Sequence, residues 1–166
     1  MARTANSAKK GAVRIVRSLP KLAVELTDLA FAAKAHWGYP RRWLQLWRSS
    51  LTLNAEYVAQ NSVYVARRGE QVVGFYAIRP WRNWARLDHL WIRPEAWGQG
   101  LGRALFEHAE SVCRRRGFKK MRVESDPNAE GFYRRLDGTR VGVSCSRLEG
   151  RWRELPVLHF SLVRAD

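Results

Sequence analysis

Three glycines at alternate positions form the segment of this sequence whose spacing is most suggestive of chemistry. Gly98, Gly100 and Gly102 lie between a predicted strand and a long predicted helix. Glycine lets a backbone approach a ligand closely, and a helix start presents unpaired N–H groups and the positive end of the helix dipole. Such a turn binds anions, and pyrophosphate is a natural guest. Arg103 adds a positive charge in the first helical turn, so we expect it to face an external anion.

Two other phosphate-binding loops are excluded by spacing. A dinucleotide-binding loop has the pattern G-x-G-x-x-G, but the last required glycine falls on Arg103 or Leu105. A P-loop requires Gly-Lys-Ser/Thr after four spacer residues, and no segment matches that pattern. A merely flexible turn would need only one or two glycines, so we interpret the segment as a pyrophosphate site.

The elements that must position this turn follow from the hydrophobic pattern. Alternating and buried-type segments predict strands at Val13–Arg17, Ser62–Ala66, Gln71–Ile78, Asp88–Ile92, Lys120–Ser125, Arg140–Ser146 and Leu155–Val163. Helical spacing and caps predict helices from Pro20 and from Pro40, a short turn after Asn54, and helices over Leu101–Arg116 and Asn128–Leu136.

The composition favours one globular domain. With 166 residues, 46% of them hydrophobic, the chain can form a packed core, which we place at residues 11–166 after a flexible basic tail at residues 1–10. We find neither a stretch of ~20 apolar residues nor an apolar signal core, so we expect a cytoplasmic protein without a membrane partner. Cys113 and Cys145 are interpreted as reduced structural thiols.

The net charge of +15 predicts a surface that attracts anions, such as the phosphates of a cofactor, acidic substrates, nucleic acid or an anionic membrane. The basic residues are dispersed along the chain instead of being concentrated in one arm. Charge alone therefore makes nucleic acid the less favoured partner.

The stretch from Leu87 to Leu105 resembles the acetyl-CoA motif of the GNAT superfamily of N-acetyltransferases, (Gln/Arg)-x-x-Gly-x-(Gly/Ala) after a strand and a short Pro-containing loop. Trp97 stands where Gln or Arg is usual, but the pyrophosphate is held by main-chain N–H groups. A second frame beginning at Gln99 also fits the pattern, although the strand-to-loop spacing favours the first. The resemblance spans about Arg14 to Val163 and is specific between about 85 and 142.

The resemblance implies an α+β fold, with a mixed, mostly antiparallel central sheet of about seven strands flanked by about four helices. It also implies that main-chain groups of the strand end pair with the pantetheine arm and that the glycine-rich turn holds the pyrophosphate. The implied acetyl-CoA-binding residues are Leu90, Trp91, Ile92, Gly98, Gln99, Gly100, Leu101, Gly102, Arg103, Asn128 and Tyr133. We expect no metal, because His108 and His159 are interpreted as packing residues.

Downstream, the segment from Asp126 to Gly138 is similar to the family's Asn…Phe-Tyr-x-x-x-Gly segment. The family's Tyr matches Tyr133, which implies that its hydroxyl protonates the leaving thiolate. A phenol with a pKa of ~10 can do so through a short hydrogen bond. Asn128 lies closer to the Tyr than usual and is either a ligand or a helix cap. Asp137 occupies the Gly position, where Asp tolerates left-handed geometry.

Amide formation also needs a base that removes the ammonium proton and a donor for the oxyanion. We rank Glu124 first as the base, followed by Asp88 and His89. Because neighbours on a strand face opposite sides, at most one of Asp88 and His89 should face the substrate. A backbone N–H of the strand ending at Ile92 could bind the oxyanion.

The acceptor site should be built from the less regular segments. His36, Trp37 and Tyr39 lie between two predicted helices and could form one wall of a substrate cleft, followed by Trp43 and Trp47. The same aromatic residues could equally belong to the core or to a homodimer surface. The predicted loop Arg147–Glu154 is the other candidate wall.

We therefore expect a cytoplasmic N-acetyltransferase that passes acetyl from acetyl-CoA to a primary amine by direct attack. The acceptor is a small-molecule or peptide amine. Two alternatives stay open: a GNAT-fold protein that binds acyl-CoA without catalysis, and a basic nucleic-acid-binding module with exposed Trp and Tyr as stacking platforms.

Overall fold

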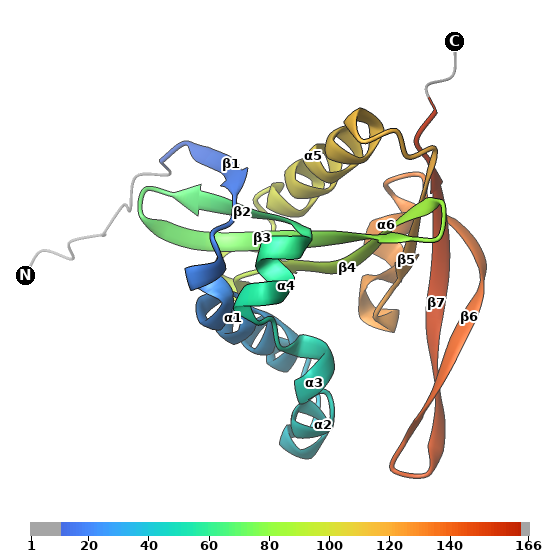
Figure 1. Ribbon diagram of the computed structural model, residues 1–166. Helices are drawn as coiled ribbons and strands as arrows, with labels where there is room; N and C mark the ends of the chain where they lie inside the picture. The colour runs from blue at the N-terminus through green and yellow to red at the C-terminus, as the bar shows by residue number, and fades with distance from the viewer. Residues whose placement is uncertain (1–10, 164–166) are drawn as a thin grey trace, which may run out of the picture.

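A computed structural model describes residues 11–163, and their strands form one seven-stranded sheet in the order β1-β2-β3-β4-β5-β7-β6 (Figure 1). All neighbouring strands are antiparallel except β4 and β5, which are parallel. This confirms the expected mixed α+β sheet, whereas the predicted tail at residues 1–10 lies outside the described residues. The strands are β1 (Val13–Arg17), β2 (Ser62–Arg68), β3 (Gln71–Trp81), β4 (Trp84–Ile92), β5 (Lys120–Glu124), β6 (Thr139–Leu148) and β7 (Arg151–Ser161).

Helices cover both faces of the sheet and bury an apolar core on each (Figure 1). The helices α1 (Ala23–His36), α2 (Arg41–Leu46), α3 (Arg48–Leu51) and α4 (Ala55–Gln60) lie towards one face, and α5 (Leu101–Arg115) and α6 (Glu130–Arg134) pack on the other. The described residues thus hold more helices than the four expected, because the helix predicted from Pro40 breaks at Trp47, whose ψ is 5°, and the short turn predicted after Asn54 forms α4. No helix within 11–163 combines the length and apolarity needed to cross a membrane.

Helix α5 shows why the sequence pattern located it well. Leu105, Ala109 and Cys113 recur at four-residue spacing and are fully buried, and Phe106 and Val112 extend the same stripe. Gly117, with φ 83°, ends the helix as predicted. Both cysteines are free: Cys113 lies on the buried side of this helix, and Cys145 is exposed.

The β6–β7 hairpin is longer than the sequence predicted. Glu149 and Gly150 both have positive φ, 50° and 76°, which is the two-residue turn geometry whose twist suits a hairpin. Strands β6 and β7 therefore run almost to this turn, and the prediction of a loop over Arg147–Glu154 is wrong. The hairpin extends alongside α2 and α3 (Figure 1), where the indole N–H of Trp43 donates to Glu149 at 2.8 Å.

The sheet opens between its two parallel strands. Strand β4 pairs with β5 only over Ala85–Leu87, opposite Met121–Val123, yet it stays paired with β3 as far as Ile92. Asp88 has no partner in the β3 register, since Ile78 faces Leu87 and Ala77 faces His89. This bulge lies where β4 and β5 separate and leaves one edge of the end of β4 unpaired.

Candidate active site

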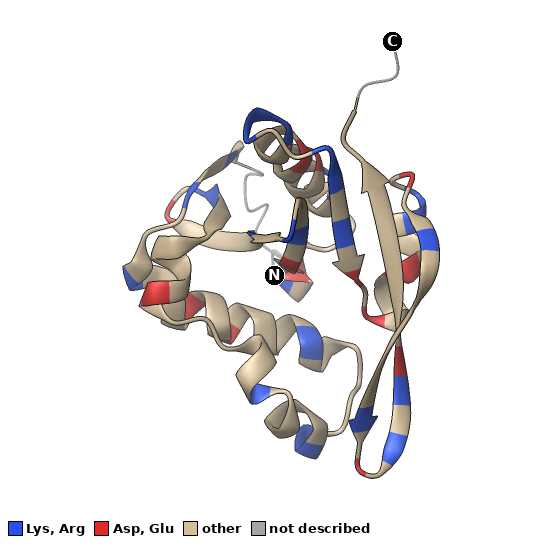
Figure 2. Ribbon diagram, turned by 45° about the vertical axis from the view of Figure 1, so that its right-hand side comes forward, with Lys and Arg blue, Asp and Glu red and all other residues tan. Residues whose placement is uncertain are grey.

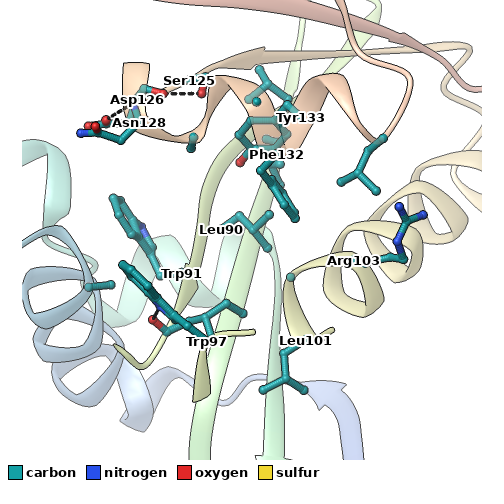
Figure 3. Close-up of a pocket in the computed structure, with 18 of the residues that line it drawn as sticks. Leu90, Trp91, Trp97, Leu101, Arg103, Ser125, Asp126, Asn128, Phe132 and Tyr133 are labelled. Atoms are coloured by element: carbon teal, nitrogen blue, oxygen red, sulfur yellow. Dashed lines mark hydrogen bonds between the residues drawn. The ribbon is translucent and has the colours of Figure 1, made fainter. Parts of the chain in front are cut away.

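A cavity of about 550 Å³ lies where β4 and β5 separate. Its walls come from both faces of the sheet: the loop before α5 and helix α6 on one face, and α1 and the exposed ends of β4 and β5 on the other (Figure 3). All residues predicted for the donor except Gln99 line it, as do the predicted catalytic residues except His89. Of the residues predicted for the acceptor wall, only Trp37 lines it; the others, which do not, are His36, Tyr39, Trp43, Trp47 and the segment Arg147–Glu154.

The unpaired edge of β4 exposes a defined set of main-chain groups. The N–H of Arg93 donates to the carbonyl of Val73 at 2.9 Å, which fixes which residues of β4 bond to β3. Because antiparallel pairing alternates, Trp91 directs its main chain to Phe75 on β3, whereas Leu90 and Ile92 direct theirs to the cavity. Two of the three residues predicted to pair with pantetheine therefore have free main-chain groups on the cavity side.

The glycine-rich turn has the backbone that the sequence predicted. Gly98 and Gly100 have φ values of 71° and 78°, and a Cβ at either position would meet no atom within 4 Å. These glycines are thus required by the backbone conformation, and the space beside them is open. Helix α5 begins directly after Gly100 without a side-chain cap, so its first N–H groups are available to an anion.

Gly102 serves a different purpose from its two neighbours. A Cβ there would lie 3.0 Å from the ring of Phe132, so this glycine lets α6 approach the start of α5. That approach places Tyr133, the next residue, over the cavity (Figure 3). Gly102 therefore positions helix α6, and with it Tyr133, beside the glycine-rich turn.

Tyr133 is 7% exposed and packs against Phe106, Phe132 and Phe160, and its hydroxyl points into the cavity (Figure 3). Burial disfavours the charged phenolate and raises the pKa of Tyr133. The hydroxyl donates no hydrogen bond to any side chain or carbonyl within 11–163. A neutral phenol with a free O–H is the form that can donate a proton.

The sequence model of the acetyltransferase (GNAT) family matches residues 24–138, which is most of the chain. The chain belongs to this acetyltransferase family. Family membership supports acetyl transfer as the general activity.

Solved GNAT structures share the fold over nearly the whole chain. A GCN5-related N-acetyltransferase from Rhodopseudomonas palustris is 19% identical, with a TM-score of 0.73 over 92% of this chain and 96% of that one. PaiA N-acetyltransferase from Thermoplasma acidophilum, in complex with coenzyme A, is 17% identical (TM-score 0.70; 90% and 99% covered). YncA from Salmonella typhimurium, with its cofactor acetyl-CoA, is 18% identical (TM-score 0.68; 94% and 97% covered).

Trp97 departs from the GNAT motif and has contacts of its own. Its indole N–H donates to the carbonyl of Ile92 at 2.9 Å, and its ring lies 4.6 Å from His36 and 5.1 Å from Trp37, centre to centre. The substitution therefore ties the glycine-rich turn both to the edge of β4 and to the end of α1. Trp37 lines the cavity, whereas His36 lies behind Trp97.

The candidate bases have different surroundings. Asp88 forms ion pairs with Arg79 at 2.5 Å and with Arg86 at 2.9 Å, and it accepts a hydrogen bond from Tyr57 at 3.0 Å. Glu124 is more exposed, and its ion pairs with Arg86 and Arg122 are longer, at 3.6 and 3.2 Å. Of the two, Glu124 has the freer carboxylate.

His89 is placed apart from the other two candidates. It is 8% exposed, packs beside Phe75 and Tyr57, and accepts a hydrogen bond from the indole of Trp91 at 3.1 Å. Burial lowers the pKa of His89 to about 4, so the imidazole is neutral at pH 7. The structure does not bring His89 to the cavity, and we do not carry it into the proposed mechanism.

A polar cluster at the end of β5 joins two residues that sequence reasoning missed, Lys34 and Arg153, to residues that it had predicted. Asp126 caps the turn at Asn128 and accepts hydrogen bonds from Tyr39 (3.0 Å) and Arg153 (3.2 Å), and it pairs with the buried Lys34. The sequence left Asn128 as either a ligand of acetyl-CoA or a helix cap. Its side chain lines the cavity and donates a hydrogen bond to the hydroxyl of Tyr39 at 3.0 Å. The cap is therefore Asp126, and Tyr39 supports the cavity wall from behind.

These contacts had almost no signal in the sequence. Lys34 and Asp126 are 92 positions apart, and Arg153 lies in a segment predicted to be a loop. Asp126 entered the sequence analysis only as the first residue of the segment that is similar to the family's. Within the described range, no group of three His, Cys, Asp or Glu side chains is placed to hold a metal ion.

Proposed function

We propose that this protein is an acetyl-CoA-dependent N-acetyltransferase that passes the acetyl group to a primary amine by direct attack. One observation carries the proposal: a single cavity contains the unpaired edge of β4, the open start of α5 and the hydroxyl of Tyr133, and it reaches both faces of the sheet. The donor and the acceptor can therefore enter from opposite faces and meet at the gap between β4 and β5.

The donor side fits the chemistry of acetyl-CoA. The main-chain groups of Leu90 and Ile92 that face the cavity match an amide-bearing pantetheine arm, which would add to the sheet like a short strand. The N–H groups from Gly98 to Arg103 match a pyrophosphate. Ile92 already gives its carbonyl to Trp97, so its N–H and the groups of Leu90 remain for the ligand.

The proposed chemistry assigns a proton role to two side chains. Glu124 accepts the ammonium proton through water, because its carboxylate lines the cavity and is the more exposed of the two that remain as candidates. The N–H of Leu90 stabilises the developing oxyanion. As the amine adds to the thioester carbonyl and the C–S bond breaks, Tyr133 donates its proton to the departing thiolate, and the second proton lost by the attacking nitrogen restores the phenol. Burial keeps Tyr133 protonated until that step.

Thiol release from acetyl-CoA, measured across a panel of primary amines, tests this proposal. We expect CoA release that depends on both the amine and the protein. Acetyl-CoA binding without release for any amine would favour the alternative of a non-catalytic acyl-CoA-binding protein. Salt-sensitive binding of RNA or DNA without acetyl-CoA binding would instead favour the nucleic-acid module.

A further inference from the structure

We propose that the open end of the sheet, outside the cavity, binds single-stranded nucleic acid. This inference goes beyond the proposed function and does not depend on it. The site lies where the β3–β4 hairpin adjoins β5 and β7, on the face of the sheet opposite α5, and we call it the aromatic–basic face. Its residues are Arg79, Trp81, Arg82, Trp84, Arg86, Lys120, Arg122 and His159.

The first row of this face is basic and crosses four strands. Arg79 of β3 lies opposite Arg86 of β4. Arg122 of β5 lies opposite both Arg86 and His159 of β7. Residues that lie opposite each other on neighbouring strands project from the same face of a sheet. Because Met121, the neighbour of Arg122, is buried in the core that α5 covers, the row projects from the other face.

The second row is aromatic and lies two residues farther from the cavity. Trp81 lies opposite Trp84, and their rings meet edge to face with 6.5 Å between centres. The guanidinium groups of Arg82 and Arg122 lie 5.2 and 5.1 Å from the ring centre of Trp81. The ammonium of Lys120 lies 4.9 Å from that of Trp84. Indole rings and cations are therefore in direct contact across this face.

The helices on this side of the sheet leave both rows uncovered. The core beneath α1–α4 takes its strand residues from β2, β3 and the end of β4, and within the described chain it includes none from β5 or β7. Arg82 and Lys120 are exposed, and the side chain of Arg79 is 42% exposed. Both indoles are half-buried. A ligand can therefore reach the rings and the cations from solvent.

The charge of this face is positive. Five cations meet two carboxylates, those of Asp88 and Glu124 at the cavity end, which leaves a net charge of +3. The sequence shows the same bias, since segments 71–87 and 111–123 contain no acidic residue. On β5, Figure 2 shows basic residues along the strand and an acidic one at its end. Such a face attracts a polyanion.

The combination of indoles and cations favours a single-stranded nucleic acid over other polyanions. Its phosphates pair with Lys and Arg, and its unpaired bases stack on indole rings and on guanidinium planes. A duplex hides its bases from such stacking, and an acidic protein segment has no bases. CoA does not account for the face, because the proposed pyrophosphate site lies at Gly100, on the α5 side of the sheet.

Fluorescence anisotropy with labelled oligouridine tests the proposal on the natural protein. We expect the single strand to bind at least about tenfold more tightly than the same strand annealed to oligoadenosine, because only the single strand can stack. Acetyl-CoA should not displace it, and poly-aspartate should bind more weakly. Oligothymidine, measured beside oligouridine, shows whether the site prefers the ribose or the deoxyribose backbone.

Variants locate the binding on this face. Trp84→Ala should weaken oligouridine binding at least about tenfold, as the loss of one stacked base predicts. Trp152→Ala is the matched control, since Trp152 is 68% exposed and has Arg147 5.0 Å from its ring centre, but lies near the tip of the β6–β7 hairpin. It should leave binding unchanged. If Trp84→Ala does not fold, Lys120→Gln, at an exposed position, should still lower the slope of log affinity against log salt by about 1.

Nucleic-acid binding and acetyl transfer are scored separately. Weaker oligouridine binding by Trp84→Ala with unchanged thiol release would support the aromatic–basic face. Equal binding of single strand and duplex, equal binding of poly-aspartate, or full affinity in both Trp84→Ala and Lys120→Gln would overturn it. Displacement by acetyl-CoA would also overturn it, because the strand would then occupy the pyrophosphate site. Absence of acetyl-CoA binding would remove the proposed function and leave this site standing.

Discussion

Replacing Tyr133 with phenylalanine is expected to lower kcat by about 100-fold and to leave the affinity for acetyl-CoA unchanged. The hydroxyl points into the cavity, while the ring is held by Phe106 and Phe160, which would hold a phenylalanine equally well. The change therefore removes a proton donor without removing packing. Steady-state thiol release, with acetyl-CoA affinity from calorimetry, gives the two quantities separately.

Tyr64→Phe is the matched control, since Tyr64 stacks on Tyr76 away from the cavity and should not change kcat. The natural enzyme offers a further check. Because burial raises the pKa of Tyr133, the phenol stays protonated as pH rises through 10, and activity should not be lost there through its ionisation. Unchanged turnover in the phenylalanine variant would remove Tyr133 from the mechanism.

The double variant Gly98→Ala/Gly100→Ala is expected to weaken acetyl-CoA binding by about 100-fold. Both residues have φ above 70°, and left-handed geometry costs an L-residue about 1–2 kcal/mol at each position. The loop would relax this strain by turning its N–H groups away from the pyrophosphate. Calorimetric titration with acetyl-CoA measures the loss.

Gly117→Ala separates backbone strain from ligand binding. Gly117 has φ 83° and open space around it, but it follows the C-terminal end of α5, at the opposite end of the helix from the glycine-rich turn, and does not line the cavity. The control should therefore lose some stability and keep its acetyl-CoA affinity. Equal losses of affinity in the double variant and in Gly117→Ala would show that the glycine-rich turn has no special part in binding.

The features that local sequence patterns control were predictable. The apolar stripe of α5, the glycines before it and the left-handed Asp137, with φ 66°, each depend on residues within a few positions. The family resemblance supplied the mixed, mostly antiparallel sheet of about seven strands, while their order in the sheet came from the structure.

The features set by tertiary contacts were not predictable. The bulge at Asp88 arises from a shift in register between β3 and β4, and the ion pair of Lys34 with Asp126 joins two segments 92 positions apart. The hairpin turn at Glu149 was missed because Glu is an unusual residue at positive φ. These contacts determine which candidate bases are neutralised, so the acceptor side could be judged only in three dimensions.

The most direct test of the central claim is thermal unfolding with acetyl-CoA, NAD and ATP in parallel. The glycine-rich turn and the unpaired edge of β4 together predict stabilisation by acetyl-CoA of about 2.7 kcal/mol at 100 times its Kd, with little effect of NAD or ATP. The double glycine variant should lose most of that stabilisation. No stabilisation by acetyl-CoA, or an equal response to all three ligands, would contradict an acetyl-CoA site at Gly98–Arg103.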